Sequence, residues 1–341
     1  MRNETRRLFN QFLSRQAELN GIDTASTKFS VDPTVQQTLE TRMQESSAFL
    51  SRINILGVDE QQGEKLGLGI NGTIASTTDT TGDGKRTPVD PTDLDAKGYH
   101  CTQTNFDTGI RYAKLDAWAK FKDFQVRIRN AILQRQALDR MMIGFNGTSR
   151  AATSNRTTNP LLQDVNIGWL EKIRQYAAAR HLAEVADGSG KIVIGGSATA
   201  ATGYKNLDAL VYDMVNNMLE PWYQDDTELV VICGRKMLSD KYFPLVNENR
   251  EPSETMAADL IISQKRIGGL SAVRVPHFPA TGLLVTRLDN LSMYYQNSAR
   301  RRHIKDDPEK DRIVNFESSN DAYVIEDYGL VALAENIELT E

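Results

Sequence analysis

Histidines and cysteines are the residues of this 341-residue chain that could most readily bind a metal or act as nucleophiles. His100 lies directly beside Cys101, a pair that could ligate a metal or form an activated thiol. Adjacent residues of a strand point to opposite faces, so a single site is not expected to use both side chains. The remaining histidines and Cys233 are scattered, without zinc-ligand spacing or a disulfide framework. We therefore expect no catalytic residue, no metal site and two reduced thiols.

Two overlapping loop segments have partial ion-binding patterns. Residues 79–90 (DTTGDGKRTPVD) place Asp at positions one, five and twelve and Gly at position six, as in part of a calcium loop. Thr at position three, Asp in place of Glu at position twelve and the lack of flanking helices favour a solvated hairpin tip. Residues 82–85 (GDGK) lack the spacing and the Ser or Thr of a phosphate loop. We expect no cofactor at either segment.

Charge is distributed without a strong bias. Lys and Arg number 40 and Asp and Glu 45, a net charge of −5 that argues against a general nucleic-acid binder. Arg300, Arg301 and Arg302 form a short basic run, expected to be a solvated face, with contact to acidic partner residues as the alternative. No apolar run approaches the ~20 residues of a membrane helix. The basic N-terminus lacks the apolar core of a secretory signal.

A long helix over residues 114–145 is the main element that would position these segments. Residues 114–143 contain no Gly or Pro, and apolar side chains recur at alternating steps of three and four, interrupted by Arg135. These side chains are Phe121, Phe124, Ile128, Ala131, Leu138, Met142 and Phe145. At ~1.5 Å per residue the helix would be roughly 48 Å long. A helix of that length spans a domain.

A long polar segment precedes this helix. Residues 65–75 alternate Leu and Ile with Gly67, Gly69 and Gly72, which is strand periodicity with one bare face. Residues 76–97 have almost no apolar side chains. We expect an extended β-hairpin over residues 55–112 that lies on another subunit. The expected inter-subunit contact residues are Gly67, Gly69, Asp79, Asp83, Lys85 and Arg86.

Both ends of the chain carry further signals. Residues 4–19 are expected to form an amphipathic helix with arginines on its polar side, followed by a loose polar linker. Residues 29–35 are expected to be extended, because Pro33 disfavours a helix before it, and residues 34–51 to form a second, mostly polar helix. From residue 206 onward the pattern is mixed α and β. Residues 229–233 form an apolar run typical of a buried central strand.

Several long segments closely resemble the major capsid proteins of Peduovirus-type temperate tailed bacteriophages. They are MRNETRRLFNQFLSRQAELNGID, MQESSAFLSRINI, GTIASTTDTTG, WAKFKDFQVRIRNAILQRQALDRMMIGFNG, EPWYQDD, GRKMLSDKYFPLVN and AADLIISQKRIGGL. The similarity runs in order from Met1 to about Glu338. It implies an α+β Hong Kong 97-type phage capsid fold with an N-terminal arm, an extended loop, a spine helix, a peripheral domain and an axial domain.

The resemblance also implies a division of the chain. An N-terminal scaffold-like segment, residues 1–29, would be removed by a maturation protease between Phe29 and Ser30. The remaining parts would be an N-arm (30–54), an extended loop (55–112), a peripheral domain with spine helix 114–145 (113–205), a mainly axial domain (206–314) and return strands of the peripheral domain (315–341). No covalent crosslink is predicted, because nothing in the sequence selects a Lys and Asn pair.

The implied function is self-assembly as hexamers and pentamers into an icosahedral procapsid and capsid that packages phage double-stranded DNA. Implied partners are other copies of the chain, a scaffolding and maturation protease protein, the portal protein and the enclosed DNA, with no membrane. The protein would be assembled in the host bacterial cytoplasm and reside in the virion. Two alternatives stay open: a soluble α/β enzyme or ligand-binding protein built around the 229–233 strand, and another ring- or tube-forming phage structural protein.

Overall fold

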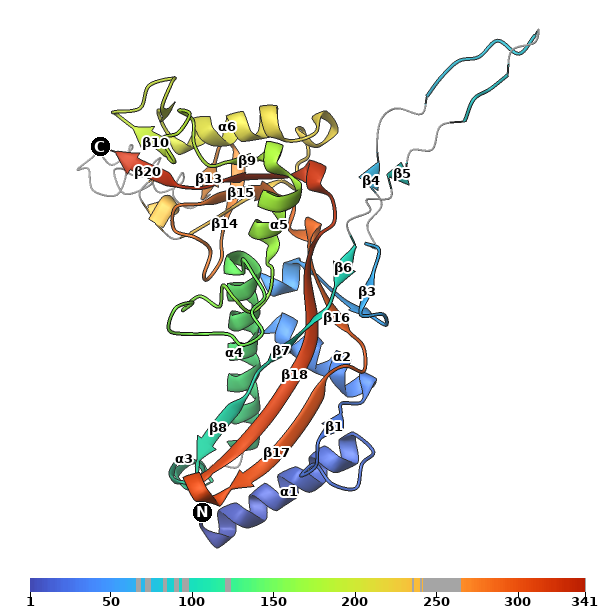
Figure 1. Cartoon of the computed structure of the whole chain (residues 1–341), viewed down its shortest axis with the longest axis vertical. Helices are drawn as coiled ribbons and strands as arrows, with labels where there is room; N and C mark the ends of the chain where they lie inside the picture. Colours follow the sequence, from blue (N-terminus) through green and yellow to red (C-terminus); the bar gives the residue numbers. More distant parts are fainter. Residues whose placement is uncertain are drawn as a thin grey trace, which may run out of the picture.

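The computed structural model describes residues 1–65, 69–70, 75–81, 85–88, 92–93, 98–119, 124–234, 236–239, 241 and 265–340. These residues form two packed bodies and a hairpin that projects beyond them (Figure 1). One buried cluster joins the bodies, because it combines Phe145 and Trp169 with Ile232 and Leu333. No described helix is long and apolar enough to cross a lipid bilayer.

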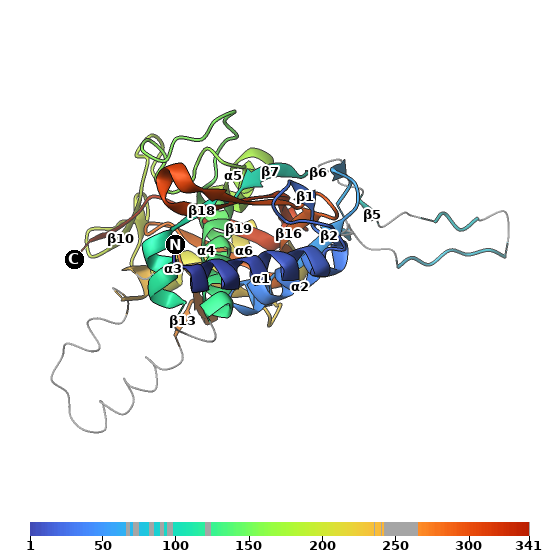
Figure 2. The same ribbon diagram turned by 90° about the horizontal axis from the view of Figure 1, so that it is seen from below.

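The first body is built on a seven-stranded sheet with the order β1-β17-β18-β16-β2, in which β7 and β8 also pair with β18. Its strands are β1 Phe29–Ser30, β2 Asn54–Val58, β7 Thr102–Asn105, β8 Thr108–Arg111, β16 Leu291–Gln296, β17 Arg301–Asp307 and β18 Arg312–Ile325. Helices α1, α2 and α4 lie on one side of β18 and β16 when the molecule is seen from below (Figure 2). The long strand β18 is therefore the axis of this body.

The predicted helix over residues 114–145 is divided in the structure. Helix α3, Tyr112–Trp118, ends with Ala119 in a turn, and α4 runs from Phe124 to Asn146. Tyr112 and Leu115 pack in a cluster with strand residues, which fixes the direction of α3 where it leaves β8. Apolar periodicity marks residues able to be helical but does not show where one helix ends and the next begins. The single 48 Å helix is therefore wrong, although its C-terminal part is a long helix.

Two further helices belong to the first body. Helix α1, Asn3–Leu19, confirms the predicted N-terminal helix. Helix α2 covers Pro33–Glu45, so the predicted extended stretch 29–35 is wrong from Pro33 onward. Pro33 occupies the first helical turn, where a missing N–H costs nothing, and Asp32 caps the helix by accepting from the Thr34 N–H at 2.9 Å.

The second body contains a six-stranded sheet of order β13-β14-β12-β15-β19-β9. Its strands are β9 His181–Leu182, β12 Val230–Cys233, β13 Arg266–Ile267, β14 Leu270–Arg274, β15 Leu283–Thr286 and β19 Val331–Ala334. All four residues of β12 are buried, which confirms the central strand predicted at residues 229–233. Helix α6, Leu207–Met218, buries Leu210 and Met214 in the same core.

A three-stranded sheet, β11-β10-β20, adjoins this body, and helix α5, Trp169–Tyr176, belongs to the core cluster shared by the two bodies. The three strands are β10 Ile192–Gly195, β11 Gly203–Tyr204 and β20 Ile337–Thr340. Short 3-10 helices occur at Leu50–Arg52, Ala178–Arg180, Pro221–Tyr223, Leu288–Asn290, Pro308–Lys310 and Tyr328–Leu330.

The predicted boundaries at residues 206 and 315 differ from the observed sheet membership. Strands β16 and β17, inside the range 206–314, belong to the first sheet beside β18. Strands β19 and β20, inside the range 315–341, belong to the second body, as do β9 to β11 before residue 206. The chain crosses between the bodies repeatedly, and buried apolar side chains occur in strands of both sheets, such as Leu291 and Met293 of β16 and Leu283 and Leu284 of β15. Composition therefore could not assign each strand to its sheet.

Candidate functional site

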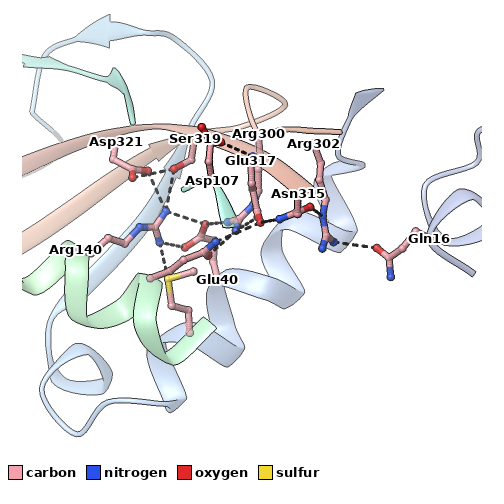
Figure 3. A network of polar contacts seen from close by, with 12 residues as sticks. Gln16, Glu40, Asp107, Arg140, Arg300, Arg302, Asn315, Glu317, Ser319 and Asp321 are labelled. Carbon is pink, nitrogen blue, oxygen red and sulfur yellow. Dashed lines mark hydrogen bonds and ion pairs between the residues drawn. The ribbon is translucent and has the colours of Figure 1, made fainter. Parts of the chain in front are cut away.

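A buried ionic network joins α2, α4 and β18 beneath the long sheet (Figure 3). Arg140 of α4 donates to the Glu40 carboxylate of α2 and, at 3.1 Å, to Asp321 of β18. Its Nη2 also lies 3.3 Å from the Ser319 hydroxyl, which donates to the second Asp321 oxygen at 2.9 Å. Each of these four side chains is almost fully buried. One guanidinium therefore fixes the distance between two helices and a strand.

Arg300 extends the network toward the edge of the sheet. Its Nη1 donates to Glu40 at 2.7 Å, and its Nε donates to Glu317 at 2.8 Å. Its Nη2 donates to the Gln136 side-chain oxygen at 3.1 Å. Glu40 therefore lies between Arg140 and Arg300 and neutralises part of each charge. Arg300 is 1% exposed, so the predicted solvated face is wrong at this residue, and its acidic contacts come from the same chain.

The electrostatics of the network favour charged side chains despite burial. Burial alone would raise the pKa of Glu40, but the positive charges of Arg140 and Arg300 hold it below its ordinary value. Burial likewise opposes the charge on Glu317, yet Arg300 and Arg302 lower its pKa to about 2. Buried ion pairs are strongly destabilising to break, because removal of one partner leaves an uncompensated charge. The network therefore acts as a rigid connection.

Helix α1 is docked on the outer part of the first body by polar contacts at its N-terminal end. The backbone N–H of Arg2 donates to Asp116 of α3 at 2.9 Å, a favourable position for a carboxylate at a helix N-terminus. Arg6 and the Tyr112 hydroxyl both donate to Asp306 of β17. Burial would raise the pKa of Asp306, but these two hydrogen bonds hold it below its ordinary value. The contacts link α1 to β17 and α3.

Apolar packing of α1 is divided between two small clusters separate from the main core. One places Phe9, Phe12 and Leu13 against buried side chains of α3, β17 and β18. The other groups Ala25, Phe29 and Val31, with Leu13 packed against them. Because these clusters are distinct from the core that joins the two bodies, α1 can leave without opening that core.

The predicted cleavage position lies within a strand. Phe29 and Ser30 form β1, which pairs antiparallel with β17 at Arg302 and Arg301. Phe29 is 8% exposed, whereas Ser30 is exposed and donates its hydroxyl to the Ser298 carbonyl at 2.8 Å. A protease would have to act on the peptide bond after β1 separates from β17, which is a local opening of the sheet edge.

The predicted hairpin contacts that the structure describes fall on a projecting arm, whose described strands are β3 Gln62–Gly63, β6 Tyr99–His100, β4 Gly69–Ile70 and β5 Thr92–Asp93. Strand β3 pairs with β6, and β4 pairs with β5. Asp79, Lys85 and Arg86 are exposed, and Asp79 accepts from the Thr81 N–H at 2.9 Å in a local turn. Gly67 and Asp83 lie outside the described residues.

The candidate chemical groups are separated in the structure. Cys101 is fully buried and His100 is exposed, as expected for adjacent residues of an extended segment. Burial raises the pKa of the Cys101 thiol to about 12 and that of Cys233 to about 11, so both thiols are protonated at neutral pH. Among the residues that the structure describes, no three His, Cys, Asp or Glu side chains could jointly hold a metal ion.

The long sheet with its spine helix, the projecting hairpin and the separate second body define the fold of phage capsid proteins. The capsid of an empty GTA particle has this fold, with a TM-score of 0.51 at 12% sequence identity, over 86% of this chain and 90% of that one. A solved structure of a satellite phage P4 procapsid, which includes a size determination (Sid) protein, matches with a TM-score of 0.83 and 51% identity. That match covers 100% of this chain and 99% of the other.

The chain belongs to the P2 family of phage major capsid proteins, which it matches over residues 8–337. It is 55% identical to the capsid protein of Escherichia phage P2 over 99% of this chain and 96% of the relative. It is 42% identical to the major capsid protein of Serratia phage KSP20, covering 100% and 99% of the two chains. The expected family and the α+β Hong Kong 97-type fold are confirmed. The protein is a structural subunit of the virion shell.

Sequence reasoning did not identify the ionic network. Arg140 lies in a helix that the spacing of apolar side chains predicts, and that spacing gives no role to Arg140. Glu317 and Asp321 lie in β18, within residues that were expected only to be return strands of the peripheral domain. The available signal was the presence of charged residues of both signs inside segments that must be buried. Such residues require partners, although the sequence does not specify which ones.

Proposed function

We propose that copies of this chain assemble as hexamers and pentamers into an icosahedral procapsid that later encloses phage double-stranded DNA. Membership of the P2 family and the likeness to a chain of the P4 procapsid carry this proposal. Many modest contacts between identical subunits add up by multivalency, so that each interface can exchange while the closed shell is stable. A scaffolding and maturation protease protein and the portal protein are the further partners that we propose.

The subunit would act by assembly and without catalytic turnover. Membership of a family of capsid proteins supports this part of the proposal. In addition, no His, Cys, Asp, Glu or Lys occurs among the described residues that line the apolar cavity beneath α1. An enzyme site needs convergent polar or titratable groups. The buried ionic network has such groups, but they are paired with one another and almost inaccessible to a substrate.

The projecting hairpin would lie on the neighbouring subunit of the same capsomer. Its projection beyond both bodies supports this role (Figures 1 and 2). The proposed contacts involve Gly67 and Gly69 in close backbone approach and Asp79, Asp83, Lys85 and Arg86 at the tip. Exposed charged pairs contribute little energy, typically about 0–1 kcal/mol, so the charges would set register more than affinity.

Residues 1–29 would form a scaffold-like segment that guides assembly and is then cleaved between Phe29 and Ser30. The separate small clusters that hold α1 support this proposal, because the segment can be lost without disturbing the main core.

The two bodies would correspond to the two domains of the capsid fold. The body around β18 would be the peripheral domain, and the body around β12 would be the axial domain at the capsomer centre.

Electron microscopy of the full-length chain, expressed with and without its scaffold protein, tests the assembly proposal. We expect closed shells, or capsomer-sized rings that become closed shells when the scaffold is present.

Mass spectrometry of shells matured with the protease tests the proposed cleavage between Phe29 and Ser30. Mature shells that retain Met1 would contradict the proposed removal of residues 1–29 but leave the assembly proposal intact.

A further inference from the structure

A cavity of about 360 Å³ lies between α1, α2, α4 and the long sheet. Its walls are mainly apolar and include Phe9 and Phe12 of α1, Leu39 of α2, Ile132 of α4, and Ile110 and Ile313 of the sheet. Ligand sites in proteins typically have volumes of roughly 300–1,000 Å³. An engineered apolar cavity of roughly 150 Å³ already binds a benzene molecule. The space beneath α1 is therefore large enough for a small organic ligand.

The polar part of the cavity wall has one sign of charge. Arg42, Arg129 and Arg302 line it, and no carboxylate occurs among the described residues of the lining. The wall therefore combines an apolar surface with an excess of positive charge.

Arg302 is the least exposed of these arginines. Its Nε donates to the Asn315 side-chain oxygen at 2.7 Å and its Nη1 to that of Gln16 at 3.1 Å, both of which are neutral acceptors. Within the described part of the chain, no carboxylate oxygen lies within ion-pair distance of this guanidinium, unlike those of Arg140 and Arg300. Desolvation lowers the pKa of Arg302, and the charge of Arg300 adds to this effect against the attraction of Glu317.

We propose that this cavity binds an amphipathic anion, namely a small molecule with one apolar chain and a carboxylate headgroup that pairs with Arg302. The apolar chain would lie against Phe12, Ile132 and Ile313, where it excludes water. A purely apolar ligand would leave Arg302 without a carboxylate within ion-pair distance, and a small hydrophilic anion would gain nothing from the apolar walls.

The ligand would contact α1 and the sheet at the same time. Because α1 forms one wall and supplies Gln16 beside Arg302, the bound ligand would stabilise the docked state of the N-terminal segment. Any molecule that binds only the docked state shifts the equilibrium toward it by mass action. This inference rests on the cavity and its charges, and it does not require that residues 1–29 are cleaved in maturation.

Isothermal titration calorimetry of assembled, uncleaved full-length chain with decanoate, below its micelle concentration, tests the proposal. Decan-1-ol serves as the uncharged probe of equal chain length. We expect saturable binding of one decanoate per chain, at least tenfold tighter than binding of decan-1-ol. The absence of saturable binding, or equal affinity for the two probes, would overturn the proposal, and this comparison needs no substitution.

Three variants locate the binding site. Ile132→Trp fills the cavity and should abolish decanoate binding, whereas Arg302→Gln should remove the preference for decanoate over decan-1-ol. Arg7→Gln changes an exposed arginine on the outer side of α1, away from the cavity, and should bind like the unsubstituted chain. Particle formation and melting temperature establish that each variant is folded. Unchanged decanoate binding in folded Ile132→Trp would place the ligand elsewhere and contradict the assignment.

Discussion

Replacement of Glu317 by Gln tests whether the buried ionic network stabilises the subunit. The substitution keeps the size of the side chain and an acceptor oxygen for Arg300 but removes the negative charge that faces Arg300 and Arg302. The fall in the pKa of Glu317 from 4.5 to about 2 corresponds to roughly 3 kcal/mol of folding free energy. Removal of one partner from buried ion pairs typically costs about 3–5 kcal/mol. The pKa shift and the typical cost of breaking a buried ion pair therefore both predict a destabilisation on the order of 3 kcal/mol at pH 7.

The assay is urea unfolding of unassembled subunits followed by tryptophan fluorescence, since Trp169 is buried in the core. Glu309→Gln is the matched control, because Glu309 is exposed in the turn before β18, and it should change the free energy of unfolding by less than about 0.5 kcal/mol. Equal unfolding midpoints for the two variants at pH 7 would refute the reasoning about the network.

The same pair of variants gives a pH signature with a defined sign. The folded-state pKa of Glu317 lies below its unfolded value, so its contribution is complete above pH 4.5 and is lost as the pH falls toward 2. The unsubstituted chain and Glu309→Gln should lose stability in this window. Glu317→Gln lacks the titrating group and should show a smaller loss there. If the free energy of unfolding of Glu317→Gln fell as steeply with decreasing pH as that of Glu309→Gln, the titration could not be assigned to Glu317.

Three further predictions concern α1, the hairpin and the thiols. Asp306→Ala removes the acceptor of Arg6 and Tyr112 and should make residues 1–29 more than tenfold more sensitive to limited proteolysis, whereas Asp23→Ala should not. Gly67→Val with Gly69→Val should reduce the yield of closed shells seen by electron microscopy, because the added side chains block close approach of a neighbouring strand. Cys101, whose pKa is raised to about 12, should react with iodoacetamide at pH 8 only after unfolding.

Each of these predictions has a result that would contradict it. Equal cleavage rates for the two aspartate variants would mean that Asp306 does not hold α1. The control for the glycine pair is Ser76→Val with Thr78→Val, which adds the same side chains at exposed positions of the hairpin. Equal shell yields from both valine pairs would show that assembly does not require close backbone approach at Gly67 and Gly69. Rapid alkylation of native Cys101 would show that its thiol is accessible.

Local signals predicted several elements because their periodicity matches how they are buried. The apolar run at residues 229–233 became the central strand β12, and the amphipathic pattern at residues 4–19 became α1. Helix α2 was predicted to begin after Pro33, whereas it begins at Pro33 with Asp32 as its cap, because proline fits the first helical turn. Capping by Asp32 and the tolerance of the first turn for proline therefore explain a boundary that the general exclusion of proline from helices misplaced.

Long-range pairing was the part that the sequence could not specify. Glu40, Arg140 and Asp321 are far apart in the chain, and only the packing of α2, α4 and β18 brings them together. Arg300 looked like one member of a solvated basic run, because its neighbours in sequence are also arginines. Arg301 is exposed while Arg300, directly before β17, is almost fully buried. This difference depends on which side of the chain faces the core, which composition does not specify.

The central claim is that this subunit builds a closed shell through contacts between copies. A cryo-electron microscopy reconstruction of particles formed by the full-length chain tests it most directly. We predict closed icosahedral shells in which the hairpin containing β4 and β5 lies on the neighbouring subunit and α1 is docked against β17 before cleavage. Small, monodisperse oligomers that never close into shells, even with the scaffold protein present, would contradict it.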